Sequence, residues 1–172
     1  NCVEPNLRTG RLLIADALDA HALASLPDWV KRRRDMRGNP WLRFAVAQLL
    51  MQAELYVRAG GMYEQARRLG HDDVEAHLGR ALAWAMEGRT NKANESMRSA
   101  LEAALPDGAE DGAPSPAAEH PLVLVVRGRI EANLGRYPSA KTYAERALET
   151  EPGLSEARML LADVAMRTRV EP

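Results

Sequence analysis

The chain has 172 residues, of which 46% are hydrophobic but only 5% are aromatic, and its 23 basic and 24 acidic residues leave a net charge of -1. This balance argues against a protein that grips many nucleic-acid phosphates, because such proteins carry a clear basic excess. A single cysteine excludes an internal disulfide and a multi-cysteine metal site. The longest strongly apolar run, Leu122 to Val126, is far shorter than the roughly 20 residues that span a bilayer. The abundant Ala and Leu favour helices, so composition predicts an all-α fold.

The single cysteine, Cys2, lies beside the first residue of the chain. A cysteine in this place fits the acylated cysteine of a bacterial lipoprotein, which would provide a lipid anchor, and an ordinary thiol is the favoured alternative. The expected compartment is the bacterial cytoplasm, or the periplasm if Cys2 is the acylated residue.

A first helix is predicted from Thr9 to about Leu26, where apolar residues recur at intervals of three and four. Pro27 is expected to begin a second, short helix. Asp16 and Asp19 lie three residues apart on the first helix, close to His21. Paired carboxylates can act as acid and base, but two structural acids on an amphipathic helix are the favoured interpretation.

The second helix carries Trp29 and the densest charge cluster of the chain. Such a patch suits a phosphate, an anionic membrane surface or an acidic protein segment. The favoured interpretation is a solvated helix face, ahead of contact with an acidic protein or a lipid, with nucleic acid last. The basic patch consists of Lys31, Arg32, Arg33, Arg34 and Arg37, and Arg43 follows it.

Beyond a break at residues 38–40, a long apolar helix is predicted from about Trp41 to Val57, ending at Gly60-Gly61. A repeating pattern of glycine turns then begins, in which helices alternate with turns and small residues recur at fixed offsets from each turn. Two antiparallel helices approach closely only where side chains are small, and glycine permits the tight turn. The turns are Gly61, Gly88 and Gly135; an alanine follows each by five residues (Ala66, Ala93, Ala140), and small residues precede the last two by seven (Ala81, Gly128).

The clearest repeat of this pattern is residues 121–154. It contains Gly128, Gly135, Tyr137, Ala140, Tyr143 and Ala147-Leu148, and Glu151-Pro152 lie near its end. These residues resemble the tetratricopeptide repeat (TPR) family, whose period is 34 residues. The resemblance implies an all-α α-solenoid of stacked antiparallel helix pairs, wound into a right-handed superhelix. The expected organisation is a divergent helical region at 1–39 and repeats over 40–172: a weak repeat at 40–73, a repeat at 74–105, an acidic loop at 106–120, a repeat at 121–154 and a capping helix at 155–172.

Two spacings depart from the 34-residue period. The turns at Gly88 and Gly135 are 47 residues apart, which indicates an insertion of 13 residues within 106–119. This segment is rich in Pro, Gly and acidic residues and is expected to be irregular. The turns at Gly61 and Gly88 are only 27 residues apart, which predicts a second helix about seven residues short.

His71, Asp72, Asp73 and His77 suggest a metal site, because these residue types bind hard or borderline ions. A helix start is the favoured interpretation, with Asp72 as the capping residue and Glu75 three positions later. No nucleophile elbow, phosphate loop or dinucleotide fingerprint occurs in the sequence. We therefore expect a protein that is not an enzyme and that has neither a cofactor nor a metal.

The TPR resemblance implies that the first helix of each pair lines a concave surface that binds another polypeptide. An amphipathic helix or an extended apolar segment would suit this surface, because methionines repack around different shapes. The alternative for several of these residues, Leu82 and Val125 above all, is a place in the core between helices. The predicted partner-binding residues are Leu78, Leu82, Met86, Leu122, Val125, Arg129, Asn133, Met159, Asp163 and Met166.

One branch of the TPR family clamps a C-terminal carboxylate with Lys, Asn and Arg at defined inner positions. The corresponding positions here hold Leu78, Leu82, Val125 and Arg129, of which only one is basic. The sequence therefore predicts a scaffold or adaptor that does not bind such tails tightly. The alternative function, from a different class, is an accessory protein that holds a small apolar ligand or lipid in an enclosed cleft.

Overall fold

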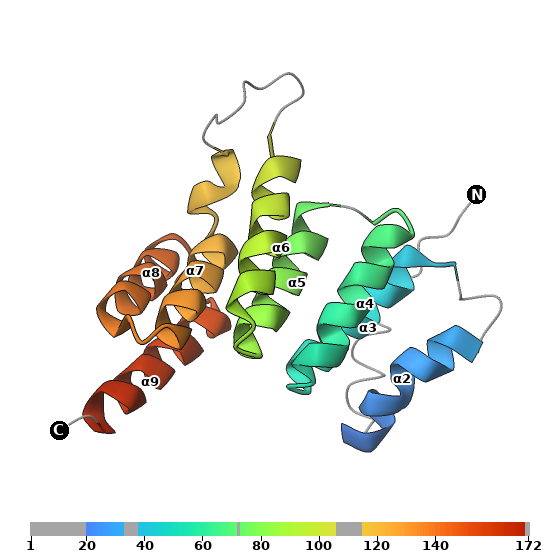
Figure 1. Cartoon of the computed structure of the whole chain (residues 1–172), viewed down its shortest axis with the longest axis horizontal. Helices are drawn as coiled ribbons and strands as arrows, with labels where there is room; N and C mark the ends of the chain where they lie inside the picture. The colour runs from blue at the N-terminus through green and yellow to red at the C-terminus, as the bar shows by residue number, and fades with distance from the viewer. Residues whose placement is uncertain (1–19, 33–37, 72, 106–114, 171–172) are drawn as a thin grey trace. The chain divides into compact units, whose positions relative to one another are not determined.

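The computed structural model describes residues 20–32, 38–71, 73–105 and 115–170, and these residues form helices and turns without a strand (Figure 1). Cys2 and the greater part of the predicted acidic loop lie outside the described residues. None of the described helices is both long and apolar enough to cross a membrane. The chain divides into two compact units between residues 72 and 73, which we call unit 1 and unit 2.

Unit 1 contains α2 (Ala20–Arg32), α3 (Pro40–Gln52) and α4 (Tyr56–Arg68). The prediction that one helix ends near Leu26 and another begins at Pro27 is wrong, because α2 runs through Pro27 without a break. A proline inside a helix removes one backbone hydrogen bond. Burial offsets that loss, since α2 packs on both α3 and α4 and the side chain of Val30 is fully buried.

The single helix predicted for residues 41–57 is in fact the end of α3 and the start of α4. The chain reverses at Glu54, whose φ of +58° lies in the left-handed region, and the Leu55 amide donates to the Leu50 carbonyl at 2.9 Å. Gly61 lies inside α4 and is not a turn, and α4 is not short, since it has 13 residues against 14 in α6 (Thr90–Ala103). The sequence misleads here because glutamate rarely adopts a positive φ.

With Glu54 as the turn, the spacing to Gly88 becomes 34 residues, the full period of the repeat. Gly88 and Gly135 have φ values of +76° and +74°. At all three turns, the amide that follows the left-handed residue donates to the carbonyl five residues earlier, from Arg89 to Trp84 at 2.8 Å and from Arg136 to Glu131 at 2.9 Å. This bond closes the C-terminus of each first helix in the same way.

The small residues of the repeating pattern are all buried where two helices meet. Five residues after each turn, an alanine packs its helix against the preceding one, and seven residues before each turn stands another small residue. With Glu54 as the turn, both offsets hold in unit 1, where the pattern counted from Gly61 gave only the alanine that follows. The buried positions are Ala59, Ala93 and Ala140 after the turns, and Ala47, Ala81 and Gly128 before them.

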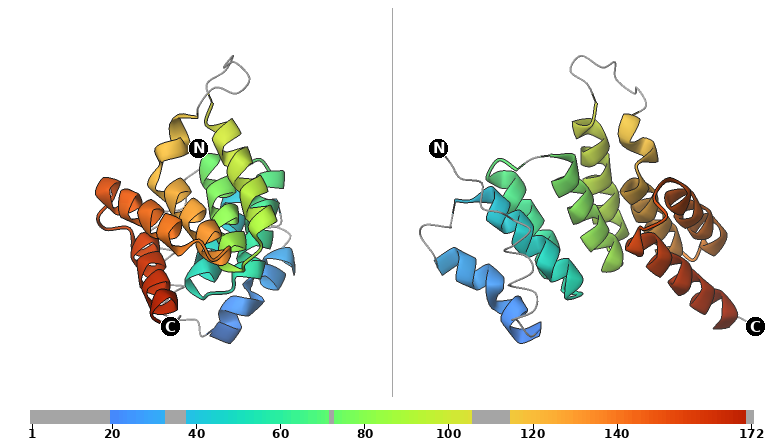
Figure 2. Two further views of the ribbon diagram at one scale, coloured as in Figure 1. Left: turned by 60° about the vertical axis from the view of Figure 1, so that its left-hand side comes forward. Right: turned by 180° about the vertical axis from the view of Figure 1, so that it is seen from behind.

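Unit 2 stacks two helix pairs and a final helix (Figure 1). Its first helices contact one another in chain order, α5 with α7 and α7 with α9, while α6 packs on α5 and α7, and α8 on α7 and α9. Figures 1 and 2 show α9 beside α7 and α8, at the C-terminal side of the unit. The elements are α5 (Val74–Met86), α6, η1 (Pro116–Glu119), α7 (Pro121–Asn133), α8 (Tyr137–Thr150) and α9 (Ser155–Val170).

The 3-10 helix η1 occupies the end of the segment that was predicted to be irregular. The Ser115 hydroxyl accepts the amide of Ala117 and so caps η1, and Glu119 pairs with Arg146 of α8. These two interactions give this end of the segment a regular structure, which corrects the prediction for residues 116–119. Residues 106–114 lie outside the described part of the chain.

Gly128 is the point at which α7 approaches its neighbours most closely. A Cβ atom at this position would lie 2.6 Å from Cδ2 of Leu160, 3.1 Å from the carbonyl oxygen of Ala140 and 3.2 Å from Cβ of Tyr143. Leu160 belongs to α9 and the other two residues to α8, so both helices press on the same point of α7. The glycine therefore sets the spacing of three helices.

Candidate functional site

Three apolar residues of the predicted partner-binding set are buried in unit 2. Leu78 packs with Ala100 and Val123, in contact with α6 and α7, and Leu82 and Val125 are also buried. Their side chains fill the interior of the unit and leave almost no area for a partner. For Leu82 and Val125, this placement agrees with the alternative raised from the sequence, a position in the core between helices.

Three polar residues from the predicted set connect the first helices to one another. Arg129 of α7 donates to the carboxylate of Asp163 in α9 at 2.5 Å. Asn133, one turn after Arg129, donates through Nδ2 to the backbone carbonyl of Ala85 in α5 at 2.7 Å. Arg129 and Asp163 are 34 residues apart, so the ion pair joins equivalent positions of successive repeats. We call these two contacts the repeat links.

Asp163 serves two arginines at once. Its other carboxylate oxygen accepts from Nε of Arg167 at 2.8 Å, and this hydrogen bond, with the charge of Asp163, raises the pKa of Arg167 above its usual value. A contact with Tyr137 acts in the same direction. The side chain of Arg129 is only 9% exposed, so Asp163 compensates a charge that water barely reaches. An anionic ligand could use Arg129 only by displacing Asp163.

The remaining predicted residues keep accessible side chains. Met86 and Leu122 are half-buried, whereas Met159 and Met166 of α9 are 53% and 62% exposed. At about 100° per residue, the two exposed methionines lie on the side of α9 opposite to its buried face, which includes Leu160. They therefore point away from α7 and do not converge with Met86 and Leu122.

Unit 2 has two helix layers: α5, α7 and α9 with the turns that follow them form the first-helix layer, and α6 and α8 form the opposite layer. Exposed apolar side chains are distributed unequally between these two layers. Among its described residues, the exposed large hydrophobic side chains are Leu134, which is 50% exposed in the turn after α7, and the two methionines of α9. The exposed positions of α6 and α8 carry polar, charged or small side chains instead. Leu134 was not predicted from the sequence, although its place between Asn133 and a turn glycine could have indicated it.

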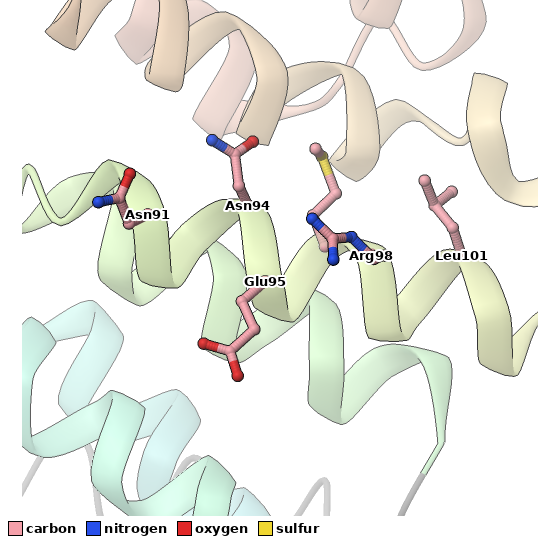
Figure 3. Close-up of a pocket in the computed structure, with 6 residues that line it drawn as sticks. Asn91, Asn94, Glu95, Arg98 and Leu101 are labelled. Atoms are coloured by element: carbon pink, nitrogen blue, oxygen red, sulfur yellow. The ribbon is translucent and has the colours of Figure 1, made fainter.

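A shallow groove of 610 Å³ runs along α6 and is lined by Asn91, Asn94, Glu95, Met97, Arg98 and Leu101. Figure 3 shows that Asn94 and Leu101 point to one side of the helix and Glu95 to the other. Two smaller hollows, of 330 and 320 Å³, are likewise lined mostly by polar side chains. None of these three surfaces resembles the apolar, enclosed cleft that a small apolar ligand requires.

In unit 1, the basic patch is described only in part. Lys31 and Arg32 are exposed at the end of α2, and Lys31 lies 3.5 Å from the carboxylate of Asp28. Arg33, Arg34 and Arg37 lie outside the described residues. Arg43, which follows the patch in sequence, is buried in α3 and donates to Gln65 at 2.5 Å, so it is not part of an exposed surface.

The residues that suggested a metal site have structural surroundings. His71 is buried beside the rings of Trp41 and Phe44, at centroid distances of 4.1 and 4.5 Å. Asp73 rather than Asp72 caps α5, accepting the amide of Ala76 at 2.9 Å. Within the described residues, no group of three His, Cys, Asp or Glu side chains is placed to hold a metal.

The carboxylate pair predicted on the first helix, Asp16 and Asp19, lies outside the described part of the chain. His21 falls in the first turn of α2.

No model of a known protein family matches the sequence, and no curated protein matches it. Solved structures do match. The TPR domain of Arabidopsis OM64 aligns with a TM-score of 0.51 and 16% identity over 74% of this chain and 94% of that domain. A double mutant of MamA RS-1 aligns with a TM-score of 0.54 and 12% identity over 98% of this chain and 88% of its own. The chain has the TPR-like helical-repeat fold. In this fold, α3–α4, α5–α6 and α7–α8 are helix pairs, and α9 takes the place of the first helix of a further pair.

Proposed function

We propose that the chain is a protein-interaction scaffold that binds a partner polypeptide through the first-helix layer of unit 2. The observation that carries this proposal is the unequal distribution of apolar side chains. The exposed leucine and methionines belong to the first helices or their turns, whereas the exposed side chains of α6 and α8 are polar, charged or small. Exposed apolar groups concentrated in one layer of a folded unit favour that layer as the protein-binding surface, with Leu134 at the ends of its helices and the α9 methionines pointing away from α7.

The partner is proposed to contact the C-terminal ends of α5 and α7, where Met86, Asn133 and Leu134 follow one another across the layer. The repeat links hold these helix ends in fixed positions before a partner arrives. A rigid surface loses little conformational entropy on binding. An amphipathic helix or an extended apolar segment fits, because the surface offers flexible apolar side chains beside one amide.

A photo-crosslinking experiment tests this assignment. A benzophenone-bearing amino acid is placed at Leu134, and a matched variant carries it at Arg98, which is exposed on α6 in the opposite layer. Circular dichroism first shows that both variants keep the helical content of the wild type. We expect one polypeptide of the source cells to crosslink from position 134 and not from 98. Identical crosslinks from both positions, or none from 134, would refute a partner site on the first-helix layer.

A further inference from the structure

Two cations at the start of α6 lie over the ring of one buried tryptophan. The guanidinium carbon of Arg89 is 5.3 Å from the ring centroid of Trp84, and Nζ of Lys92 is 4.9 Å from it. Trp84 belongs to α5 and is buried, whereas both cations are exposed. Within the described structure neither cation forms an ion pair, not even with Glu87, the acid nearest to Arg89 in sequence. We call Arg89 and Lys92 the α6 cation pair.

The next repeat shows how such a cation is compensated. Arg136 follows its turn glycine directly, as Arg89 does. Glu131 stands four residues before that glycine, where the preceding repeat has Trp84. Nη1 of Arg136 lies 3.5 Å from the carboxylate of Glu131. The arginine thus recurs in both repeats, but in the α5–α6 pair an aromatic ring replaces the acid that would compensate it.

Helix stability does not account for the α6 cation pair. The first turns of α5 and α9 carry Glu75 and Glu156, and negative charge is favourable at a helix N-terminus. In contrast, α6 has no acid in its first turn, where Lys92 lies, and Arg89 is its N-cap residue. Both charges oppose the helix dipole. Contact with the ring stabilises each cation but does not neutralise it, so an anion from outside the chain is the remaining source of compensation.

A hollow at the same place has room for a small anion. Its volume is 330 Å³, and none of the residues that line it is acidic. No side chain caps α6, so the first amides of the helix are left to water or to a bound anion. The indole nitrogen of Trp84 also has no hydrogen-bond acceptor in the described structure. The lining residues are Gly88, Arg89, Thr90, Asn91 and Lys92.

We propose that the α6 cation pair binds a phosphate dianion in this hollow, either inorganic phosphate or the phosphate group of an ester. One carboxylate compensates the single charge of Arg136, but Arg89 and Lys92 together carry two charges, which a dianion matches. Phosphate oxygens accept from the planar fork of an arginine and from a lysine ammonium group at once. Trp84 holds both cations close together before the anion arrives, which lowers the entropy lost on binding.

NMR of the isotopically labelled chain, titrated with inorganic phosphate, tests this site. Phosphate replaces chloride at constant ionic strength and at mildly alkaline pH, where it is mainly a dianion. We expect saturable shifts of the Trp84 indole signal and of the Asn91 and Lys92 amides, in the millimolar range because the cations are exposed to water. Acetate, a monoanion, should need a concentration at least several-fold higher. The absence of saturable shifts, or equal binding of acetate, overturns the proposal.

Neutral substitutions locate the site. Arg89→Gln and Lys92→Gln should each weaken phosphate binding at least several-fold, and both side chains are exposed, so the fold should persist. Arg136→Gln is the matched control, because it removes an exposed arginine at the equivalent position whose charge Glu131 already compensates. It should bind phosphate like the wild type. Equal weakening by all three substitutions would mean that phosphate responds only to the overall charge of the surface, and the site would be disproved.

Asn91→Asp supplies an anion from the chain itself. Asn91 is exposed and lines the hollow, and aspartate has nearly the same size. The new carboxylate should weaken phosphate binding at least several-fold. The melting temperature should stay the same or rise, since an acid in the first turn is favourable to α6, so the lost binding is not a loss of fold. Phosphate binding that is unchanged in this variant contradicts the assignment.

The source of the phosphate group is resolved by a second probe, N-acetylphosphoserine amide. Tighter binding of this ester than of inorganic phosphate supports a phosphorylated side chain as the ligand, and equal or weaker binding supports the free ion. The inference does not rest on the proposed partner site. Arg89→Gln and Lys92→Gln leave Leu134 and Met86 unchanged, so the crosslink from position 134 and the binding of phosphate can each fail while the other is observed.

Discussion

The helix pairs α3–α4 and α7–α8 share one backbone design but differ in the residues that produce it. The left-handed turn residue is Glu54 in the first pair and Gly135 in the second. The small residue seven positions earlier is Ala47 in the first pair and Gly128 in the second. The turn thus tolerates a residue with a side chain, at some cost in strain, whereas at Gly128 a Cβ atom would press on both α8 and α9.

The two pairs also use a buried arginine differently. Arg43 of α3 donates to Gln65 in α4, within its own pair. Arg129 of α7 donates to Asp163 in α9, in the following repeat. The first contact strengthens a pair, and the second fixes one repeat to the next. The following substitutions test these differences, beginning with the largest expected effect.

Asp163→Ala should destabilise the protein by about 3 kcal/mol, because it leaves the buried charge of Arg129 without its partner. Urea unfolding followed by circular dichroism measures the change. The control is Lys141→Ala, which removes an exposed pair with Glu145 and should change stability by less than about 0.5 kcal/mol. Equal effects of the two substitutions would show that the repeat link between α7 and α9 contributes little.

Gly128→Ala should lower the free energy of unfolding by about 1–2 kcal/mol, since the added methyl group enters a contact that is already filled. Gly61→Ala is the matched substitution in unit 1. A Cβ atom there meets nothing within 4 Å, so the better helix propensity of alanine should stabilise the protein by up to about 1 kcal/mol. Opposite signs in urea unfolding support the comparison, and a stabilising Gly128→Ala contradicts it.

Glu54→Gly should stabilise the protein by about 1 kcal/mol, because glycine adopts a positive φ without the steric cost that a side chain incurs. Gly135→Ala should destabilise it by a similar amount for the converse reason. Thermal unfolding of the two variants checks both signs. If Glu54→Gly is neutral or destabilising, the turn of the first pair is not the left-handed one described above.

A peptide that ends in acidic residues and a free carboxylate should show no tight binding. Arg129, the one basic residue at the clamp-equivalent positions, is buried and already bonded to Asp163. Isothermal titration calorimetry with such a peptide checks this expectation. A low-micromolar affinity that Asp163→Asn alters would mean that the link opens to admit a ligand.

The sequence predicts the elements of unit 2 well because their signals are local. Gly88 and Gly135 mark the turns, and alanines at fixed offsets mark the faces that pack. The turn at Glu54 could not be predicted in this way, since glutamate gives no sign of a positive φ and the nearby Gly60-Gly61 gives a false one. Only the 34-residue distance back from Gly88 could have located it.

The candidate site was harder to predict, because the residue type does not reveal which neighbour a side chain meets. Val125 and Met159 were assigned to one surface and stand at equivalent positions 34 residues apart, yet Val125 is buried and Met159 is exposed. The pairing of Arg129 with Asp163 joins equivalent positions of two repeats. A search for opposite charges one period apart would have found it.

The central claim is that the first helix pair obeys the same 34-residue design as the others and turns at Glu54. NMR of the isotopically labelled chain tests it most directly, through the backbone couplings of Glu54 and the hydrogen exchange of the Gly61 amide. We predict a positive φ at Glu54 and an exchange-protected, helical Gly61. A helix that continues through Glu54, with an unprotected Gly61 at a turn, would contradict the account.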